Sequence, residues 1–155
     1  MVRRQQVRPI SRQAGAAAIE FALLFTLFYA IFYALVSYAI TMMLQQSFTH
    51  AAAEGARAAI AVNPLAYPDT TSFNAAVATR VRSTVDDALA WLPQKAKTAV
   101  TGNNVGIAWD GNILTVQVRY AGYAADPMLP ALNLPMIGDV PKLPAVLAGS
   151  ASITL

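Results

Sequence analysis

The spacing of hydrophobic residues changes along this chain, and each spacing predicts a different element. From Phe21 to Leu44 there are 24 residues without a charge. At about 1.5 Å per residue this run spans roughly 36 Å, enough to cross a hydrocarbon core of about 30 Å. An alanine-rich stretch continues to Val62, where Pro64 prevents further helix. We therefore expect one helix over residues 16–62, with a transmembrane span at about 21–44.

After a turn containing Pro64 and Pro68, a second helix is predicted. Thr70, Thr71 or Ser72 is expected to cap its start, and Pro93 to close it. Between them, large apolar residues recur at spacings of three and four, as on the buried face of a helix. These residues are Phe73, Val77, Val81, Val85, Leu89 and Leu92.

Alternating apolar residues in the last third of the chain predict strands. Two alternating runs, 105–109 and 114–120, flank Asp110-Gly111, which is a strong hairpin signal. Ala151, Ile153 and Leu155 suit a third strand, and the proline-rich segment 126–144 predicts a long irregular connection. The expected fold class is α+β: the long helix, then an extracytoplasmic domain at 63–155 with one helix packed on a small antiparallel sheet of about three strands.

The distribution of charge predicts the orientation of the membrane span. Only 12% of residues are charged, and the net charge is +3. Four arginines precede the span, whereas the remaining chain holds seven basic and eight acidic residues. The basic leader, residues 1–15, thus favours a cytoplasmic N-terminus with the C-terminal domain outside, and the charge pattern does not favour nucleic acid as a partner. The leader arginines are Arg3, Arg4, Arg8 and Arg12.

Catalytic and cofactor motifs are missing from the sequence. There is no cysteine, and the single histidine, His50, cannot form a multi-histidine metal site. No phosphate-binding loop, nucleophile elbow or zinc-protease motif occurs. We predict a protein that is not an enzyme and has no metal and no cofactor.

The stretch between the arginines and the apolar run carries the most specific signal. It reads Gly15-Ala16-Ala17-Ala18-Ile19-Glu20-Phe21 and is followed by Ala22-Leu23-Leu24. With the later Ala53-Glu54-Gly55-Ala56-Arg57-Ala58, it resembles the TadE-like family of minor pilins (pseudopilins) from tight-adherence, Flp-type (type IVb) pilus systems. The similarity covers residues 12–62, and each part of it is weak alone.

The resemblance implies how the segment works. A prepilin peptidase would cleave between Gly15 and Ala16, and Glu20, followed by Phe21, would pair with the N-terminal amine of a neighbouring subunit. The implied partners are this peptidase, other pilins and minor pilins, an inner-membrane assembly platform and membrane lipid. The implied location is the cytoplasmic (inner) membrane and the extracellular pilus. From physics alone, Glu20 equally fits a residue that merely lies at the headgroup level.

Small residues recur every three to four positions on one side of the apolar helix. Such a face lets another helix approach closely, although membrane helices also contain Ala and Thr by chance. The predicted packing face consists of Ala22, Thr26, Ala30, Ala34, Ser37 and Thr41.

Three functions from different classes compete. A pilin predicts loss of about 15 residues, and an uncleaved anchored envelope protein with an outer binding domain predicts none. A secreted enzyme with a signal peptide predicts loss of about 50, because Ala51, Ala52 and Ala53 come near a cleavage site. Gly15 with Glu20 favours the first, and the missing catalytic motifs disfavour the third.

Overall fold

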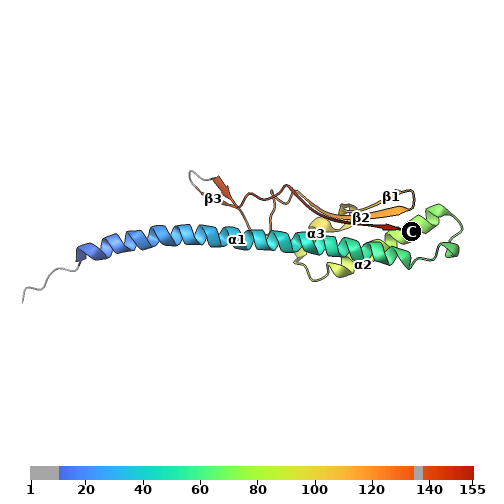
Figure 1. Ribbon diagram of the computed structural model, residues 1–155, viewed down its shortest axis with the longest axis horizontal. Coiled ribbons are helices and arrows are strands. Elements are labelled where there is room, and N and C mark those ends of the chain that lie inside the picture. The colour runs from blue at the N-terminus through green and yellow to red at the C-terminus, as the bar shows by residue number, and fades with distance from the viewer. Residues whose placement is uncertain (1–10, 135–137) are drawn as a thin grey trace, which may run out of the picture. The chain divides into compact units, whose positions relative to one another are not determined.

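The computed structural model describes residues 11–134 and 138–155 (Figure 1). The described residues divide between Val36 and Ser37 into two compact units, and helix α1 (Ser11–Ile60) contributes to both. The first unit contains only the N-terminal part of α1, whereas the second contains the rest of α1 and all other elements. The helix starts at Ser11, ahead of the expected Ala16, and therefore includes the last residues of the predicted leader.

The C-terminal half of α1 is the central element of the second unit. Its buried side begins with two large residues, Leu44 and Phe48, and continues with small ones. The small residues are Ala51, Ala52, Gly55, Ala56 and Ala59. A Cβ on Gly55 would lie 2.9 Å from the Val85 side chain and 3.2 Å from that of Val81. Gly55 therefore allows helix α2 (Thr70–Ala88) to approach α1 closely.

The apolar stripe of α2 faces the core as predicted. Val77, Val81 and Val85 are fully buried, and Phe73 packs against the core from its edge. The cap is one residue earlier than expected, because the Asp69 carboxylate accepts the Ser72 N–H at 2.7 Å. The helix also ends earlier, at Ala88, and Pro93 precedes a short helix, α3 (Gln94–Val100), which the sequence analysis did not predict.

A three-stranded antiparallel sheet completes the unit, which confirms the α+β class. Its order is β1 (Val105–Asp110), β2 (Ile113–Ala121) and β5 (Val146–Thr154). Asp110 pairs with Ile113, so the hairpin turn consists of Gly111 and Asn112 rather than the expected Asp110-Gly111. Gly111 has a φ of 58°, which its lack of a Cβ permits. Every second residue of β2, beginning at Leu114, points into the core.

Strand β5 lies against the backbone of α1. A Cβ on Gly149 would overlap backbone atoms of Phe48 and Thr49, so no larger residue fits without a shift. In Figure 1 this strand runs beside the second half of α1. The contact fixes the sheet against the helix at one point.

The proline-rich segment is more ordered than predicted. Strands β3 (Leu132–Leu134) and β4 (Gly138–Val140) form a separate two-stranded ribbon within it. Pro130 and Pro141 lie outside the paired residues, so neither removes a ladder hydrogen bond. Two 3₁₀ turns, Pro64–Ala66 and Gly102–Asn104, complete the elements.

Candidate functional site

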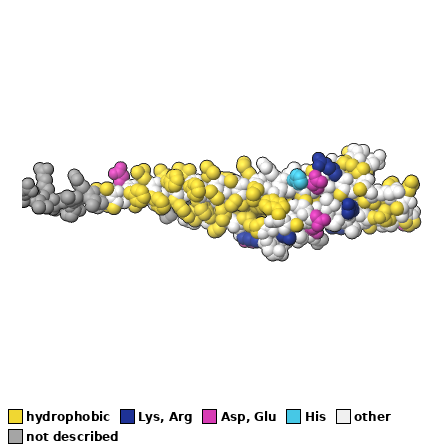
Figure 2. Space-filling model, turned by 90° about the horizontal axis from the view of Figure 1, so that it is seen from below, with side chains coloured by type: hydrophobic (Ala, Val, Ile, Leu, Met, Phe, Trp, Pro, Cys, Tyr) yellow, Lys and Arg dark blue, Asp and Glu magenta, His cyan; other side chains and the backbone are white. Residues whose placement is uncertain are grey.

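The candidate site is the N-terminal part of α1, where large apolar side chains have no covering protein. The helix is long and apolar enough to cross a membrane, with a mean hydropathy of 2.1 in a window of which none is buried. Phe21 is 67% exposed and Phe25 is 54% exposed. Figure 2 shows hydrophobic side chains covering this part of the helix on the face in view. These features fit a single-pass membrane anchor.

Aromatic rings stack along the outside of the anchor. Phe21 and Phe25 have ring centroids 5.9 Å apart, and Phe25 and Tyr29 follow at 6.3 Å. A second pair, Phe28 and Phe32, lies at 6.1 Å. Four-residue spacing on a helix produces such neighbours, so the rings form a bulky side of the anchor.

Gly15 and Ala16 lie inside the helix, not at its end. Nothing in the described structure comes within 4 Å of a Cβ built on Gly15. The backbone here is open on its outer side, and glycine weakens a helix interior by about 1 kcal/mol relative to alanine. The expected cleavage point is thus accessible but helical.

Glu20 is exposed at the start of the apolar run. Among the residues that the structure describes, no hydrogen bond or ion pair is recorded for its carboxylate. Phe21, the next residue, is exposed as well. The Glu20 carboxylate is therefore available to a partner outside the chain.

The predicted packing face is divided between the two units. Ala22 and Thr26 are exposed, and Ala30 and Ala34 are half-buried. Ser37 and Thr41 are buried, and the Thr41 and Tyr123 hydroxyls are hydrogen-bonded at 3.1 Å. The chain's own domain thus covers the last two positions, a contact that the sequence analysis did not foresee.

The structure describes the backbone at only one of the four leader arginines. Arg3, Arg4 and Arg8 lie outside the described residues, and Arg12 falls in the first turn of α1.

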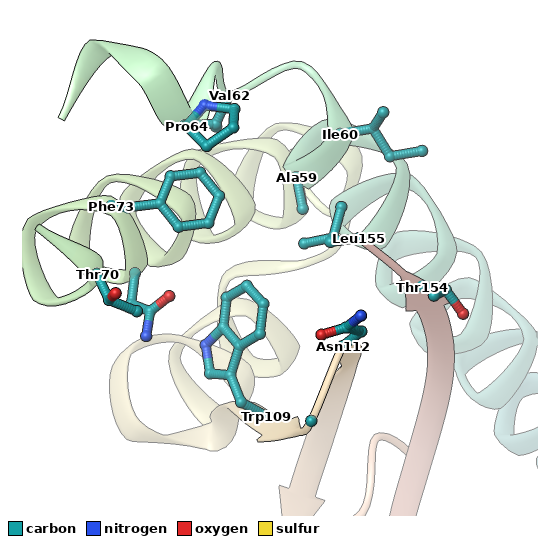
Figure 3. Close-up of a pocket in the computed structure, with 12 residues that line it drawn as sticks. Ala59, Ile60, Val62, Pro64, Thr70, Phe73, Trp109, Asn112, Thr154 and Leu155 are labelled. Atoms are coloured by element: carbon teal, nitrogen blue, oxygen red, sulfur yellow. The ribbon is translucent and has the colours of Figure 1, made fainter.

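A cavity at the C-terminal end of α1 was not anticipated. It has a volume of about 530 Å³. Phe73 and Trp109 form one side, with ring centroids 6.4 Å apart, and Leu155 and Asn112 point into it from the other (Figure 3). Aromatic rings, aliphatic groups, amides and hydroxyls line it without a charged side chain. Such walls suit an uncharged, partly apolar group. The signal that could have located it is Trp109, a large aromatic beside the hairpin turn.

Three ionisable groups in the second unit have shifted pKa values, and each has a structural cause. The N–H of Ser72 donates to Asp69 and lowers the pKa of that carboxyl. The pKa of Lys95 is raised by its hydrogen bond to Asp126, at 2.6 Å. Burial raises the pKa of Tyr120, whose hydroxyl donates to the Asp126 carbonyl. Asp69 caps a helix, Lys95 forms a surface ion pair, and Tyr120 is a core residue bonded to a backbone carbonyl. The described residues hold no group of three or more His, Asp or Glu side chains that could bind a metal.

Comparison with known proteins gives one match. Residues 15–57 match the model of a family described as TadE-like protein, which is less than a third of the chain. The match begins at Gly15 and includes Glu20 and Gly55, and it confirms the resemblance seen in the sequence. The family is associated with Tad pilus systems and is generally non-enzymatic. Searches of curated proteins and of solved structures found no match.

Proposed function

We propose that this chain, which carries a TadE-like segment at residues 15–57, is a structural minor pilin (pseudopilin) of a tight-adherence, Flp-type pilus. One observation carries the proposal most directly. Within the family segment, the helix leaves its large apolar side chains exposed before Val36 and is packed into a folded domain after Ser37. A subunit that moves from membrane to filament needs such a helix, because it contacts first lipid and then other helices.

Processing is the first step of this function. A prepilin peptidase cleaves after Gly15, removes the four leader arginines and leaves Ala16 as the N-terminus. The open backbone at Gly15 supports access by a protease, and the weak helix propensity of glycine supports local unwinding. The new amine has a pKa near 8 and is mostly charged at neutral pH.

Glu20 then provides registry between subunits. A carboxylate that leaves the headgroup layer for a bundle of apolar helices is costly unless a cation pairs with it. The Ala16 amine of a neighbouring subunit supplies that cation. The exposed position of Glu20, without a recorded partner in the described chain, supports this role.

Partner helices contact the small face of the anchor. This contact uses the exposed Ala22 and Thr26 and the half-buried Ala30 and Ala34, since Ser37 and Thr41 are buried in the domain. Replacing Ala30 and Ala34 with leucine should reduce co-purification with other pilins. Ala39→Leu is the matched control, because Ala39 is exposed on the opposite side of α1.

The protein inserts once in the inner membrane, with its N-terminus in the cytoplasm, and an assembly platform moves it into the pilus. The decisive test is the N-terminus of the membrane-extracted protein, measured by intact mass with and without a co-expressed prepilin peptidase. We expect a start at Ala16 only with the peptidase, and an intact Met1 start in Gly15→Leu but not in Ala17→Leu. An intact start in the unaltered protein, with the peptidase active on another substrate, would overturn the processing step.

Assembly is tested separately with Glu20→Ala. This variant should be processed normally but be depleted from sheared pilus fractions. Glu54→Ala changes a half-buried acid further along the same helix, paired with Arg57 at 2.9 Å, and should assemble normally. If the two variants entered the pilus fractions equally, Glu20 would have no role in registry between subunits.

An uncleaved anchored binding protein is the second candidate, and the cavity beside Trp109 favours it. A site of about 530 Å³ with aromatic and amide walls is large enough for a small ligand. This candidate predicts a Met1 start in all conditions and no loss of pilus formation when the gene product lacks Glu20.

A further inference from the structure

Along α1, the exposed apolar residues end at a later position than the one where the folded domain begins to cover the helix. On the side of the helix that the domain leaves open, apolar residues continue to Met43, and Met42 is 64% exposed. The open side then becomes polar: Gln45, Gln46, Thr49 and His50 form a surface groove with Met42. A change from apolar to polar exposed residues marks where a membrane helix leaves the hydrocarbon layer. The open side therefore leaves lipid at about residue 44.

On the opposite side of α1, the folded domain begins to cover the helix about two turns before residue 44. Ser37 and Thr41 are already buried, and Tyr123 reaches Thr41. The Tyr38 hydroxyl donates to the Lys142 carbonyl at 3.2 Å. From Ser37 to Leu44, the same turns of α1 thus carry folded protein on one side and exposed apolar residues on the other. At about 1.5 Å per residue this overlap is roughly 12 Å deep.

Side chains of the kinds found at membrane interfaces lie at the overlap and just after it along α1. Trp91 is 58% exposed and lines a groove with Met43, Ser47 and His50. Tyr38 is exposed, and so is Lys142, whose backbone carbonyl accepts the Tyr38 hydroxyl. Trp and Tyr prefer the headgroup layer because their rings are apolar with one polar atom, and Lys extends its amine toward lipid phosphates.

We infer that the base of the folded domain, defined by Tyr38, Trp91 and Lys142, sits within the interfacial layer of the bilayer. This inference rests on the membrane-anchor part of the proposed function, but not on cleavage or on pilus assembly. The occupant of the surface is lipid, because the surface is continuous with the exposed apolar face of the anchor at Met42 and Met43. A domain seated this way needs to be lifted out of the lipid surface when the subunit enters a filament.

The two tryptophans of the chain provide an internal test. Trp91 lies beside Met43 and Ser47, whereas Trp109 lines the cavity with Ala59 and Ile60. Ile60 is 13 to 17 residues further along α1, which corresponds to roughly 20 to 25 Å. Trp109→Phe leaves Trp91 as the only indole, and Trp91→Phe leaves Trp109 as the matched control.

The experiment is tryptophan quenching in the full chain, reconstituted in phosphatidylcholine–phosphatidylglycerol vesicles that contain lipids brominated at shallow or deep acyl positions. We expect Trp91 emission to lie at shorter wavelength and to be quenched most by the shallow label. Trp109 emission should be the same with and without bromine. The inference would be overturned if the shallow and deep labels quenched Trp91 equally, if only the deep label quenched it, or if neither did. If neither label quenched Trp91 and aqueous acrylamide did not reach it either, a protein surface would cover Trp91 instead.

A second measurement does not depend on tryptophan. The chain has no cysteine, so Lys142→Cys and Ala108→Cys can each carry one spin label. Ala108 is exposed on β1, away from the base. Collision with membrane-soluble oxygen should be higher at position 142 than at 108, and collision with an aqueous nickel chelate lower. Equal values would overturn the inference even if the N-terminal mass supports cleavage, and an uncleaved Met1 start would leave it intact.

Discussion

The two halves of α1 belong to one continuous helix, yet they use side-chain size in opposite ways. The N-terminal half places phenylalanine, leucine and isoleucine outward, and these remain exposed. The C-terminal half buries alanine and glycine against α2 and β5, with Phe48 as its largest buried residue. Large exposed groups suit lipid or a partner helix, whereas small buried groups allow other backbones to approach. Side-chain size on each face therefore separates the exposed part of this helix from the part that packs into the domain.

The largest expected effect separates two phenylalanines of the same helix. Phe48 is fully buried, so Phe48→Ala should destabilise the second unit by about 3–5 kcal/mol through lost burial and a cavity. Phe25→Ala should leave the stability of that unit unchanged, because Phe25 belongs to the exposed half. Thermal unfolding in detergent, followed by near-ultraviolet circular dichroism, measures both. Similar losses would contradict the division of the helix.

The next effect tests how closely β5 approaches α1. Gly149→Ala should cost about 3 kcal/mol, because its Cβ would overlap the backbone at Phe48 and Thr49, which cannot rotate away. Gly106→Ala is the matched change in β1, where the new Cβ would meet Gln117 at an ordinary 3.8 Å. Denaturant unfolding compares the variants, and equal stability would show that β5 is not held against the helix.

A smaller effect compares two threonines that make the same local bond. Thr26 and Thr41 each donate to the carbonyl four residues earlier, at 2.7 and 2.9 Å. Only Thr41 also accepts from a buried tyrosine, Tyr123. Thr41→Val should therefore cost about 1–3 kcal/mol by leaving that hydroxyl without a partner. Thr26→Val should not change the stability of the second unit, and an equal loss in both would place the effect in the helix itself.

The smallest effect is a pH dependence at the cap of α2. Because Ser72 lowers the folded-state pKa of Asp69 below its ordinary value near 3.8, the contribution is complete above that value and is lost as pH falls through the folded pKa. Asp69→Asn keeps a capping oxygen that does not titrate, so its stability should fall less below about pH 4. Asp86→Asn, on the exposed side of α2, serves as the control. Melting temperatures from neutral pH to pH 3 measure the difference.

The sequence predictions were most accurate where a feature depends on residues that are close together in the chain. The stripe from Val77 to Val85 predicted α2 and its buried face, because four-residue spacing is a local property. Its cap was assigned one residue late, since Asp69 and the hydroxyls after it are all acceptable caps. Helix α3 was missed because Pro93 predicted the end of one helix, whereas it is the N-cap of the next; the fixed φ of proline permits both positions.

The candidate site was predicted in part for the same reason. The apolar run, Gly15 and Glu20 are consecutive in the chain, so their pattern was visible and the family match covers them. The burial of Ser37 and Thr41 was not visible, because Tyr123 lies 82 residues away from Thr41. Whether those two side chains are buried depends on where the rest of the domain packs against α1.

The sequence by itself predicted the long apolar helix that fits a membrane anchor and the class of the fold, because each follows from residues close together in the chain. Only the tertiary structure decided at which residue the folded domain begins to bury the apolar helix. Gly149 and Gly55 look alike in the sequence, yet one admits a strand and the other a helix to the surface of α1. Close contact between distant backbones depends on the whole fold, and a local pattern of small residues does not specify its partner.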